Sequence, residues 1–477
     1  MRTNFVFSLP AQYSMVKAGE KYYILGQMPR RQMNISPGLY ALLQKLIHGQ
    51  EDVAPAEKDW QNIFTLAARG YLKIERSQIK RAYYAKVSVI IPVKNRPEDL
   101  ADCLHSLNQL DWPKDALEII VVDDGSTDET PQIAENLGAV VIRKAHSEGP
   151  AAARNLGAKS ATGEYLAFID SDCTVESDWL HILMPWAESP TIGAVGGFVA
   201  SYYTESALDR YEEASSSLNM GKRLLYEGNT ESNFYVPSCN LIVNAKVFQE
   251  VNGFNPAMHL GEDVDFCWRM RSRGYGLLYV PEGKAWHKHR NILGQMLKRR
   301  LQYGTSEADL YGRHREKKKL FPVPLSALIC YIGFTLAILC GSLWWLLLLI
   351  LGFALDIKRK TKLCRLIGEK MSFWSLSYAT FRNIFAFFYY LSFHIIRYYF
   401  LFLLVISVFW HNLLLWLLFS LFLAAIVDYK LRKPRLNFFS FWYFYLLEQI
   451  YYQTGVATGC YKHKYFKCYM VKWQLIK

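Results

Sequence analysis

Cysteine is sparse in this sequence and is never arranged in close pairs. Nine cysteines stand scattered over 477 residues, none in C-x-x-C spacing, and several lie inside apolar segments. This pattern supports neither a zinc site nor a disulfide framework, so we expect a reducing compartment. A secretory signal is also lacking, because Met1 to Leu9 is short and mixed and a long polar region follows it.

Acidic residues are too few to balance the basic ones. The chain has 55 lysines and arginines against 42 aspartates and glutamates, which gives a formal net charge of +13. The basic residues gather beside apolar runs and do not form a face interleaved with aromatic residues. We therefore expect membrane lipid as a partner, and no nucleic acid.

Long apolar runs are absent before residue 322 and dominate after it. Pro324 to Leu355 and Ile384 to Val427 are nearly unbroken, and both exceed the roughly 20 residues of one spanning helix. Basic clusters flank both blocks, so each block crosses an even number of times or dips in and returns, with hairpin tips at Gly341-Ser342 and His411-Asn412. We expect about four membrane-embedded helices, some of which can lie along the interface, in the cell membrane with the part of the chain before them on the cytoplasmic face.

The end of the chain continues this membrane-associated region. An aromatic interfacial segment is expected near Phe438 to Tyr452, and a basic tail runs from Lys462 to Lys472. Arg397 sits inside the second apolar block, one turn after His394. A charge at such a position is a functional candidate, but we favour an arginine that snorkels to the helix end.

Two buried strands, each ending in a polar turn, predict a nucleotide pocket. Val87 to Ile91 and Leu117 to Val122 are β-branched runs typical of parallel, doubly covered strands, and a helix-period segment around Leu100 joins them. Pro92 to Asn95 and Asp123 to Ser126 stand at their carboxyl ends. In open α/β sheets ligands bind beyond those ends.

A third strand ends in a pair of carboxylates. Tyr165 to Ile169 is followed by Asp170-Ser171-Asp172, and the small residues from Pro150 to Gly157 predict a preceding helix that packs closely. If the chain turns there, the two carboxylates can hold Mg²⁺ or Mn²⁺, one of them directly and the other directly or through water. A solvated turn is the alternative for an isolated Asp-x-Asp. Its position after a strand of the same sheet favours the metal site.

A fourth acidic group begins a helix that ends near Gly274. Glu262 and Asp263 lie in the first turn, where the helix dipole favours carboxylates, so capping is one explanation. The other is catalysis by a general base that takes the proton of an acceptor hydroxyl.

These four elements together resemble family-2 glycosyltransferases of the GT-A fold, a Rossmann-like α/β domain, over about Val87 to Arg290. The resemblance implies a UDP-sugar donor, a divalent metal (Mn²⁺ or Mg²⁺) and direct displacement with inversion. It implies Asp263 as the base, with Glu262 beside it, and Asp170, Asp172 and His287 (chosen over His289) as metal ligands. It assigns to nucleotide-sugar binding Pro92, Val93, Asn95, Asp123, Asp124, Arg154, Asp170 and Ser171.

Residues 1–82 are predicted to form a separate small winged-helix-like domain. Lys21 to Leu25 is expected as a strand, Ser36 caps a helix with Pro at its first position, and Trp60 to Arg69 leads into a short strand ending at Ile74. That shape ordinarily serves DNA binding or scaffolding. This copy resembles PqqD-like peptide-recognition domains, which bind a precursor peptide along a strand edge.

The resulting order is a recognition domain (1–82), a catalytic domain (83–312) and a helical membrane-associated region (313–477). This order resembles the mycofactocin-system glycosyltransferases, as do Arg299 to Ser306 and Gln453 to Gly459. The resemblance implies transfer of glucose from UDP-glucose to a peptide-derived redox cofactor, extended as a short β-linked oligosaccharide. Precursor peptide and other maturation enzymes are the implied partners. No residue here distinguishes glucose from galactose.

Three other functions are weighed against this one. A processive polysaccharide synthase would need a Gln-x-x-Arg-Trp signature, and Gln295 to Arg299 is only an approximation of it. A membrane glycosyltransferase acting on a polyprenyl-phosphate or cell-envelope polysaccharide acceptor uses the same pocket and stays open. A membrane-anchored peptide-binding module without activity would require damaged carboxylate motifs, and they are intact.

Overall fold

The computed structural model describes residues 5–27, 30–50, 55–76, 83–228, 230, 232–366 and 371–476. The chain forms two compact units. Unit 1 comprises Met1–Tyr202 and Ser216–His289, and unit 2 comprises Tyr203–Ser215 and Arg290–Lys477. The predicted boundary at residue 82 lies outside the described residues, and the division into three domains stays a prediction.

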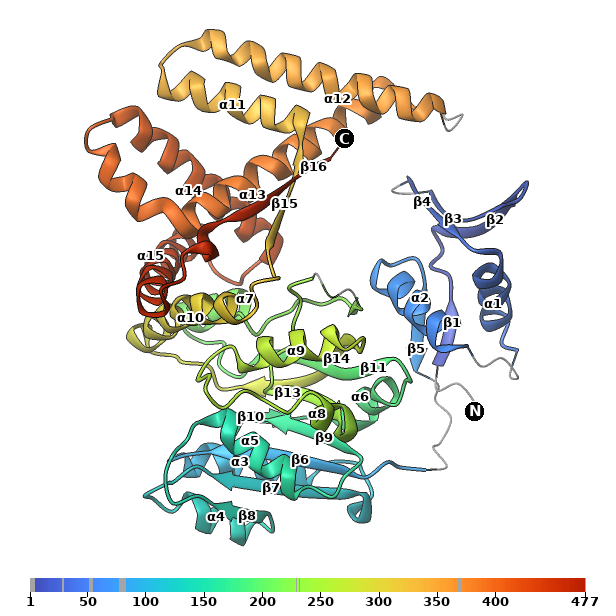
Figure 1. The fold of residues 1–477 in the computed structure, drawn as a ribbon, viewed down its shortest axis with the longest axis vertical. Helices are drawn as coiled ribbons and strands as arrows, with labels where there is room; N and C mark the ends of the chain where they lie inside the picture. The colour runs from blue at the N-terminus through green and yellow to red at the C-terminus, as the bar shows by residue number, and fades with distance from the viewer. Residues whose placement is uncertain are drawn as a thin grey trace. The chain divides into compact units, whose positions relative to one another are not determined.

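A nine-stranded mixed sheet organises unit 1 (Figure 1). Its order is β10-β14-β11-β13-β9-β6-β7-β8, and β12 pairs with β14. The strands are β6 (Val87–Val93), β7 (Leu117–Asp123), β8 (Val140–Arg143), β9 (Tyr165–Ile169), β10 (Cys173–Val175), β11 (Ile192–Ser201), β12 (Leu225–Glu227), β13 (Asn240–Asn244) and β14 (Gly276–His287).

The parallel part of this sheet brings the predicted turns to one edge. Strand β6 pairs in parallel with β7 on one side and with β9 on the other, as the apolar runs predicted. Val93 at the end of β6 stands opposite Asp123 at the end of β7. Since the carboxyl ends of parallel strands share an edge, the turns after β6, β7 and β9 converge there. Strand β13, antiparallel to β9, continues the sheet toward β11.

Helices cover both faces of the sheet for reasons visible in the sequence. In α3, Pro97 occupies the first turn and Leu100, Leu104 and Leu107 are fully buried. A β-carbon on Gly157 of α5 would lie 2.6 Å from Ile90 Cγ2, so only glycine allows this approach. The described helices of unit 1's sheet domain are α3 (Pro97–Asn108), η1 (Lys114–Ala116), α4 (Thr130–Asn136), α5 (Pro150–Ser160), α6 (Trp179–Ala187), α8 (Ala245–Glu250) and α9 (Glu262–Ser272).

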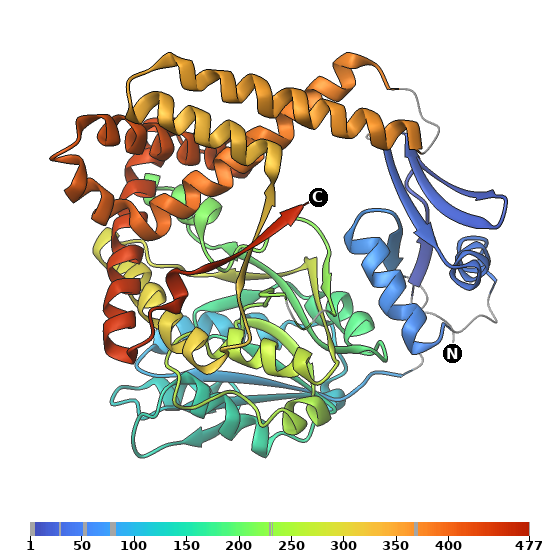
Figure 2. The same cartoon turned by 45° about the horizontal axis from the view of Figure 1, so that its top comes forward.

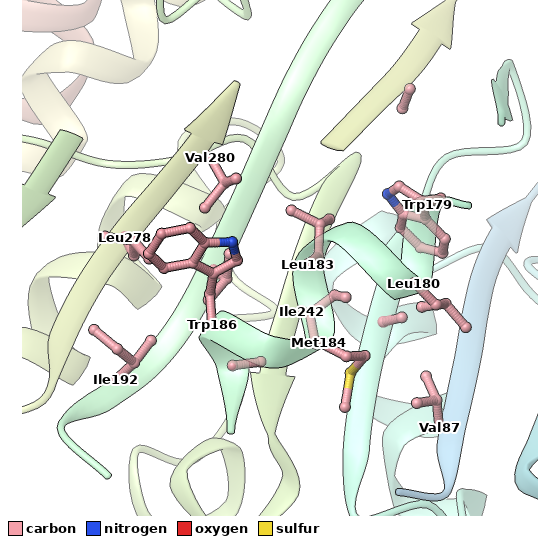
Figure 3. Close-up of a cluster of buried hydrophobic side chains, with 14 of the residues drawn as sticks. Val87, Trp179, Leu180, Leu183, Met184, Trp186, Ile192, Ile242, Leu278 and Val280 are labelled. Atoms are coloured by element: carbon pink, nitrogen blue, oxygen red, sulfur yellow. The ribbon is translucent and has the colours of Figure 1, made fainter. Parts of the chain in front are cut away.

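Helix α6 supplies the aromatic and aliphatic side chains of one core layer (Figure 3). Its Trp179, Leu183 and Trp186 lie against Ile242 and Val280 of the sheet, and all are almost completely buried. Trp179 Nε1 donates to Asn240 Oδ1 at 2.9 Å, so the indole nitrogen keeps a partner inside the core. This layer packs α6 against β13 and β14.

The first part of unit 1 is a small mixed α/β arrangement. The predicted strand is β3 (Lys21–Gln27), and Ser36 Oγ accepts from Leu39 N at 3.2 Å at the start of α1 (Pro37–Ile47), which confirms the predicted cap. Further elements are β1 (Phe5–Ser8), β2 (Tyr13–Ala18), β4 (Arg30–Ile35), α2 (Glu57–Ala68) and β5 (Lys73–Arg76). Strands β2, β3 and β4 form one antiparallel sheet, and β1 pairs with β5.

This first part packs on the sheet domain within unit 1 through aromatic rings. The Phe5 ring centroid lies 4.5 Å from that of Trp186, and Phe64 contacts both Trp186 and Tyr226. Burial of such large rings contributes on the order of 1.5–3 kcal/mol each.

Unit 2 is mostly helical. Its elements are α7 (Ala207–Ser215), α10 (Leu293–Arg313), β15 (Lys319–Pro324), α11 (Leu325–Leu339), η2 (Leu343–Leu346), α12 (Leu347–Leu366), α13 (Phe373–Ser407), α14 (His411–Arg432), α15 (Phe438–His463), η3 (Lys467–Tyr469) and β16 (Val471–Ile476). Figure 2 shows β16 alongside β15, with which it pairs in parallel.

Helices α10 and α15 approach each other at the level of their backbones. A β-carbon on Gly304 of α10 would collide with the Tyr452 carbonyl oxygen, and β-carbons on Gly455 and Gly459 of α15 would collide with the Leu301 and Thr305 carbonyl oxygens. Glycines four residues apart allow this close helix packing in both lipid and water.

The predicted hairpins are present as the helix pairs α11/α12 and α13/α14, with turns at Gly341 and just before His411. Among the described residues two helices, Phe373–Ser407 and His411–Arg432, are long and apolar enough to cross a membrane, which is weak evidence for spanning. The snorkelling prediction for Arg397 is wrong. Its Nη1 lies 3.2 Å from Glu448 Oε1 and 3.0 Å from Gln449 Oε1, because α15 offers a carboxylate partner.

Candidate active site

The turns after β6 and β7 are tied together by side chains. Asn95 adopts a left-handed conformation (φ 51°), its backbone N–H donates to Ser126 Oγ at 2.9 Å, and its Oδ1 accepts from Thr127 N at 2.9 Å. Asp123, which is buried, accepts from Ser126 N at 3.0 Å. The two turns therefore form one rigid rim.

Both carboxylate oxygens of Asp124 accept hydrogen bonds from the segment that follows β8. Lys144 Nζ lies 2.7 Å from its Oδ1, Ser147 Oγ lies 2.7 Å from its Oδ2, and the Glu148 and Gly149 N–H groups donate at 3.0 and 2.8 Å. Burial alone would raise the pKa of this carboxyl, but the four donors outweigh burial and lower it. Asp124 is therefore an anion that orders the loop leading into α5.

Arg154 of α5 joins two acidic motifs that are far apart in sequence. Its Nη2 lies 2.6 Å from Asp170 Oδ1 and its Nη1 lies 2.9 Å from Glu262 Oε1. The guanidinium is buried and stacks over the Phe254 ring at 5.6 Å. Burial opposes its charge, but the two carboxylates more than compensate and raise the pKa of Arg154. The turn after β9 and the start of α9 thus face the same guanidinium group, that of Arg154.

Asp172 faces a different set of partners. Arg96, in the turn after β6, places Nη1 2.6 Å from Asp172 Oδ2. Asp172 Oδ1 is buried without a hydrogen-bond partner, and His287 Nε2 from the end of β14 lies 3.5 Å from it. An orphaned buried carboxylate oxygen is costly unless a ligand completes it.

The donor set around Asp172 fits a divalent cation. The ligand atoms of Asp172, Cys173 and His287 lie within 4.8 Å of one another. Carboxylate oxygen and imidazole nitrogen suit Mn²⁺, whereas a thiol suits softer ions, so Asp172 and His287 are the fitting pair. His289 instead has Nδ1 2.7 Å from Ser201 Oγ. Asp170 points to Arg154 and is not in this group.

Asp263 lies in the first turn of α9 beside Glu262, after Gly261 in a left-handed conformation (φ 79°). Burial raises the pKa of Asp263 to about 7 and the neighbouring charge of Glu262 adds to that, while the Val264 N–H and Arg154 pull in the opposite direction. A carboxylate with a pKa near neutrality is matched to proton abstraction at physiological pH.

The structure thus brings together most of the residues selected from the sequence. Pro92 and Val93 are buried at the end of β6, and Ser171 is buried between the two aspartates of the third turn. Sequence reasoning missed Arg96 and Lys144, which neutralise Asp172 and Asp124. Arg96 shortly follows a predicted strand, and that position was the available signal, whereas Lys144 follows β8, a strand that was not predicted.

Comparison with known proteins agrees with this geometry. The family described as "Glycosyl transferase family 2" matches residues 88–251. A pre-mycofactocin glycosyltransferase of Mycobacterium tuberculosis is 34% identical over 269 residues, which cover 56% of each chain. The glycosyltransferase AglE of Haloferax volcanii is 29% identical over 254 residues, which cover 52% of this chain and 81% of that protein. The comparisons support a family-2 glycosyltransferase domain in this part of the chain.

The chain spans little more than half the length of the Mycobacterium relative. Among solved structures, a mannosyltransferase from Pyrobaculum calidifontis in complex with GDP-Man and Mn²⁺ covers 58% of this chain and 76% of its own, with 20% identity and a TM-score of 0.41.

Proposed function

We propose that this chain is a metal-dependent, inverting glycosyltransferase that moves a sugar from a nucleoside diphosphate onto an acceptor hydroxyl. The observation that carries the proposal is the bridge formed by Arg154, which pairs with Asp170 and Glu262 from two separate acidic turns. Asp263 adjoins this bridge, and Asp172 with His287 lies at the neighbouring turn.

The proposed roles follow from these contacts. Asn95, Asp123 and Pro92 form the rim on which the base and ribose rest, and Asp124 holds the loop before Arg154 in place. Asp172 and His287, with Asp170 nearby, would hold the cation, which when bound supplies charge neutralisation at the diphosphate. Arg154 adds positive charge there. Asp263 takes the acceptor proton on the opposite face of the sugar, and Glu262 keeps Arg154 oriented.

We propose a peptide-derived redox cofactor as the acceptor and UDP-glucose as the donor, with a short β-linked oligosaccharide as product. The 34% identity to a pre-mycofactocin glycosyltransferase supports this acceptor. Residues 1–82 would act as a PqqD-like, winged-helix-like module that recognises the precursor peptide or the maturation enzymes. The outer strands of the β2-β3-β4 sheet are suited to strand addition.

A lipid-linked or cell-envelope acceptor is the second candidate. It is favoured by the apolar side chains exposed on unit 2, among them Trp344 and Phe402. Such a surface would hold the chain at the cell membrane, with the catalytic part on the cytoplasmic side, where it would meet a polyprenyl-phosphate acceptor.

The test is transfer by the purified full chain. UDP-glucose, UDP-galactose and GDP-mannose are offered with Mn²⁺, Mg²⁺ or chelator, against the peptide-derived cofactor and against a polyprenyl phosphate. We expect metal-dependent transfer from UDP-glucose to the first acceptor with inverted anomeric configuration. Transfer only to the lipid favours the second candidate. If no pair of donor and acceptor gives either transfer or donor hydrolysis, the proposed glycosyltransferase activity is refuted.

Deleting residues 1–82 separates recognition from chemistry. The deletion should raise the KM for the peptide-derived acceptor and leave hydrolysis of the donor in water nearly unchanged. Donor hydrolysis also reports whether the remaining sheet domain is folded once Trp186 loses its contact with Phe5. An unchanged acceptor KM would remove the recognition role.

A further inference from the structure

The closed ends of the two helix hairpins in unit 2 lie together. Asn412 Nδ2, at the start of α14, donates to the Leu339 carbonyl oxygen at the end of α11 at 3.2 Å. One turn further along, Trp416 Nε1 donates to Thr335 Oγ1 at 3.1 Å. Both views show the α11/α12 and α13/α14 turns side by side (Figures 1 and 2). We call residues 341–347 and 408–412 the hairpin tips.

The hairpin tips are apolar and exposed. Trp344 is 80% exposed, Phe409 89% and Val408 80%, and neither segment contains Asp, Glu, Lys or Arg. A loop that emerges into water on the far side of a membrane would ordinarily be polar. Contiguous exposed aromatic and aliphatic side chains instead mark a surface that is covered by another apolar phase.

The opposite ends of the same hairpins carry charge and amphipathic rings. Lys358, Lys362 and Arg365 near the end of α12 are exposed. At the start of α13, Trp374 and Tyr378 are 80% and 69% exposed. Lysine and arginine next to tryptophan and tyrosine are typical of the headgroup layer, where anionic lipids attract the cations.

On α12 and α14, the charge-free helix between the first acidic residue and the tip is shorter than a bilayer core. At 1.5 Å per residue, about 20 Å of helix separates Asp356 from Leu343, and about 26 Å separates Asp428 from His411. Asp356 is bound by Lys360 and Asp428 by Arg432, so both positions carry fixed ion pairs. The hydrocarbon core is about 30 Å thick, and one leaflet contributes about half of that.

We propose that both hairpins enter a lipid bilayer from one face and return to it, with their tips ending inside the hydrocarbon core. The occupant of the exposed apolar surface is thus lipid acyl chains, and anionic headgroups contact the Lys358 to Arg365 end. The inference rests on the membrane association proposed above and is independent of sugar transfer. The chain would be monotopic, and neither hairpin would span.

Two native cysteines allow a matched test. Cys340 is exposed directly before the first hairpin tip and Cys364 is partly exposed at the basic end, whereas the other seven cysteines are buried. Full-length C364S keeps only the tip thiol accessible, C340S keeps only the basic-end thiol, and the double variant sets the background. Each is treated with a charged, membrane-impermeant maleimide in right-side-out and in inverted membrane vesicles.

We expect Cys364 to react in one vesicle orientation and Cys340 to react in neither. Because a charged reagent is excluded from the bilayer core, labelling of Cys340 should be on the order of 100-fold slower than in detergent. A fluorophore attached to Cys340 in detergent and returned to vesicles should be quenched by nitroxides on lipid acyl chains and not by iodide.

Each other outcome overturns the proposal. Reaction of Cys340 from the face opposite to Cys364 means that the hairpins span the membrane. Reaction of both thiols from the same face means that the helices lie on the surface. Release of the chain from vesicles by alkaline carbonate would refute membrane embedding itself, while transfer activity measured on the same preparation reports the proposed function separately.

Discussion

Replacing Asp263 by asparagine removes the proposed base while leaving the shape of the site nearly intact. A positioned general base contributes about 10²- to 10⁴-fold, so kcat/KM should fall by that factor. Binding of UDP should hardly change, since the role proposed for Asp263 is at the acceptor and not at the nucleotide. In the wild type, kcat/KM should rise with pH to a plateau above about 7, because burial and Glu262 raise the pKa of the base to about 7.

The same substitution should stabilise the folded protein, although it lowers the activity. One pKa unit is worth about 1.4 kcal/mol, so a pKa raised from 3.8 to about 7 means that the ionised carboxylate costs several kcal/mol, on the order of 4, in the folded protein. The folded state holds the proton more tightly than the unfolded state. The contribution of this carboxyl to the free energy of unfolding is therefore fully present below pH 3.8 and is lost as pH rises to about 7.

The asparagine side chain carries no such charge, so Asp263→Asn should raise the Tm relative to wild type, more at about pH 8 than at about pH 5. Asp265→Asn is the control on the same helix. It removes the negative charge that pairs with Arg269 Nη2, 2.7 Å away, and should lower the Tm at both pH values without the catalytic loss. Full turnover by Asp263→Asn, or a Tm difference that does not grow with pH, would refute the assignment of Asp263.

Asp172→Ala should weaken Mn²⁺-dependent UDP binding in calorimetry, and an unchanged dependence on the metal would count against Asp172 as a ligand. Arg96→Gln should lower the apparent Kd for Mn²⁺ without nucleotide, because the guanidinium 2.6 Å from Asp172 no longer competes; weaker metal binding would mean that Arg96 supports the site instead. Gly455→Ala should cost about 1–3 kcal/mol of stability and so lower the Tm, since its β-carbon would collide with the Leu301 carbonyl oxygen. Gly294→Ala, with open space around it, is the matched control, and equal Tm values for both would contradict the close packing of α10 and α15.

Much of the sheet domain could be read from the sequence because its signals are local. Strand β9 has the predicted bounds, Tyr165–Ile169, and the helix-period leucines of α3 are buried as expected. The order β9-β13-β11-β14 was not predicted, because an apolar run identifies a strand and not its neighbour. In the first part of the chain, β1, β2 and β4 escaped notice, since short strands with polar residues give weak alternation.

The site shows the same division between local and long-range information. The acidic turns could be predicted because acidic residues directly follow predicted strands. The pairing of Arg154 with both Asp170 and Glu262 could not, because Arg154 and Glu262 are 108 residues apart and only the fold brings them together. Arg397 illustrates the limit: its partner Glu448 lies on another helix, and nothing near Arg397 in sequence announces it.

The most direct test of the account is the anomalous signal of Mn²⁺ in a structure of the full chain with UDP and Mn²⁺. The account predicts one peak at Asp172 and His287, with the diphosphate beside it and Arg154 and Asp263 facing the same space. A peak bound elsewhere, or UDP held away from the turns after β6, β7 and β9, would contradict it.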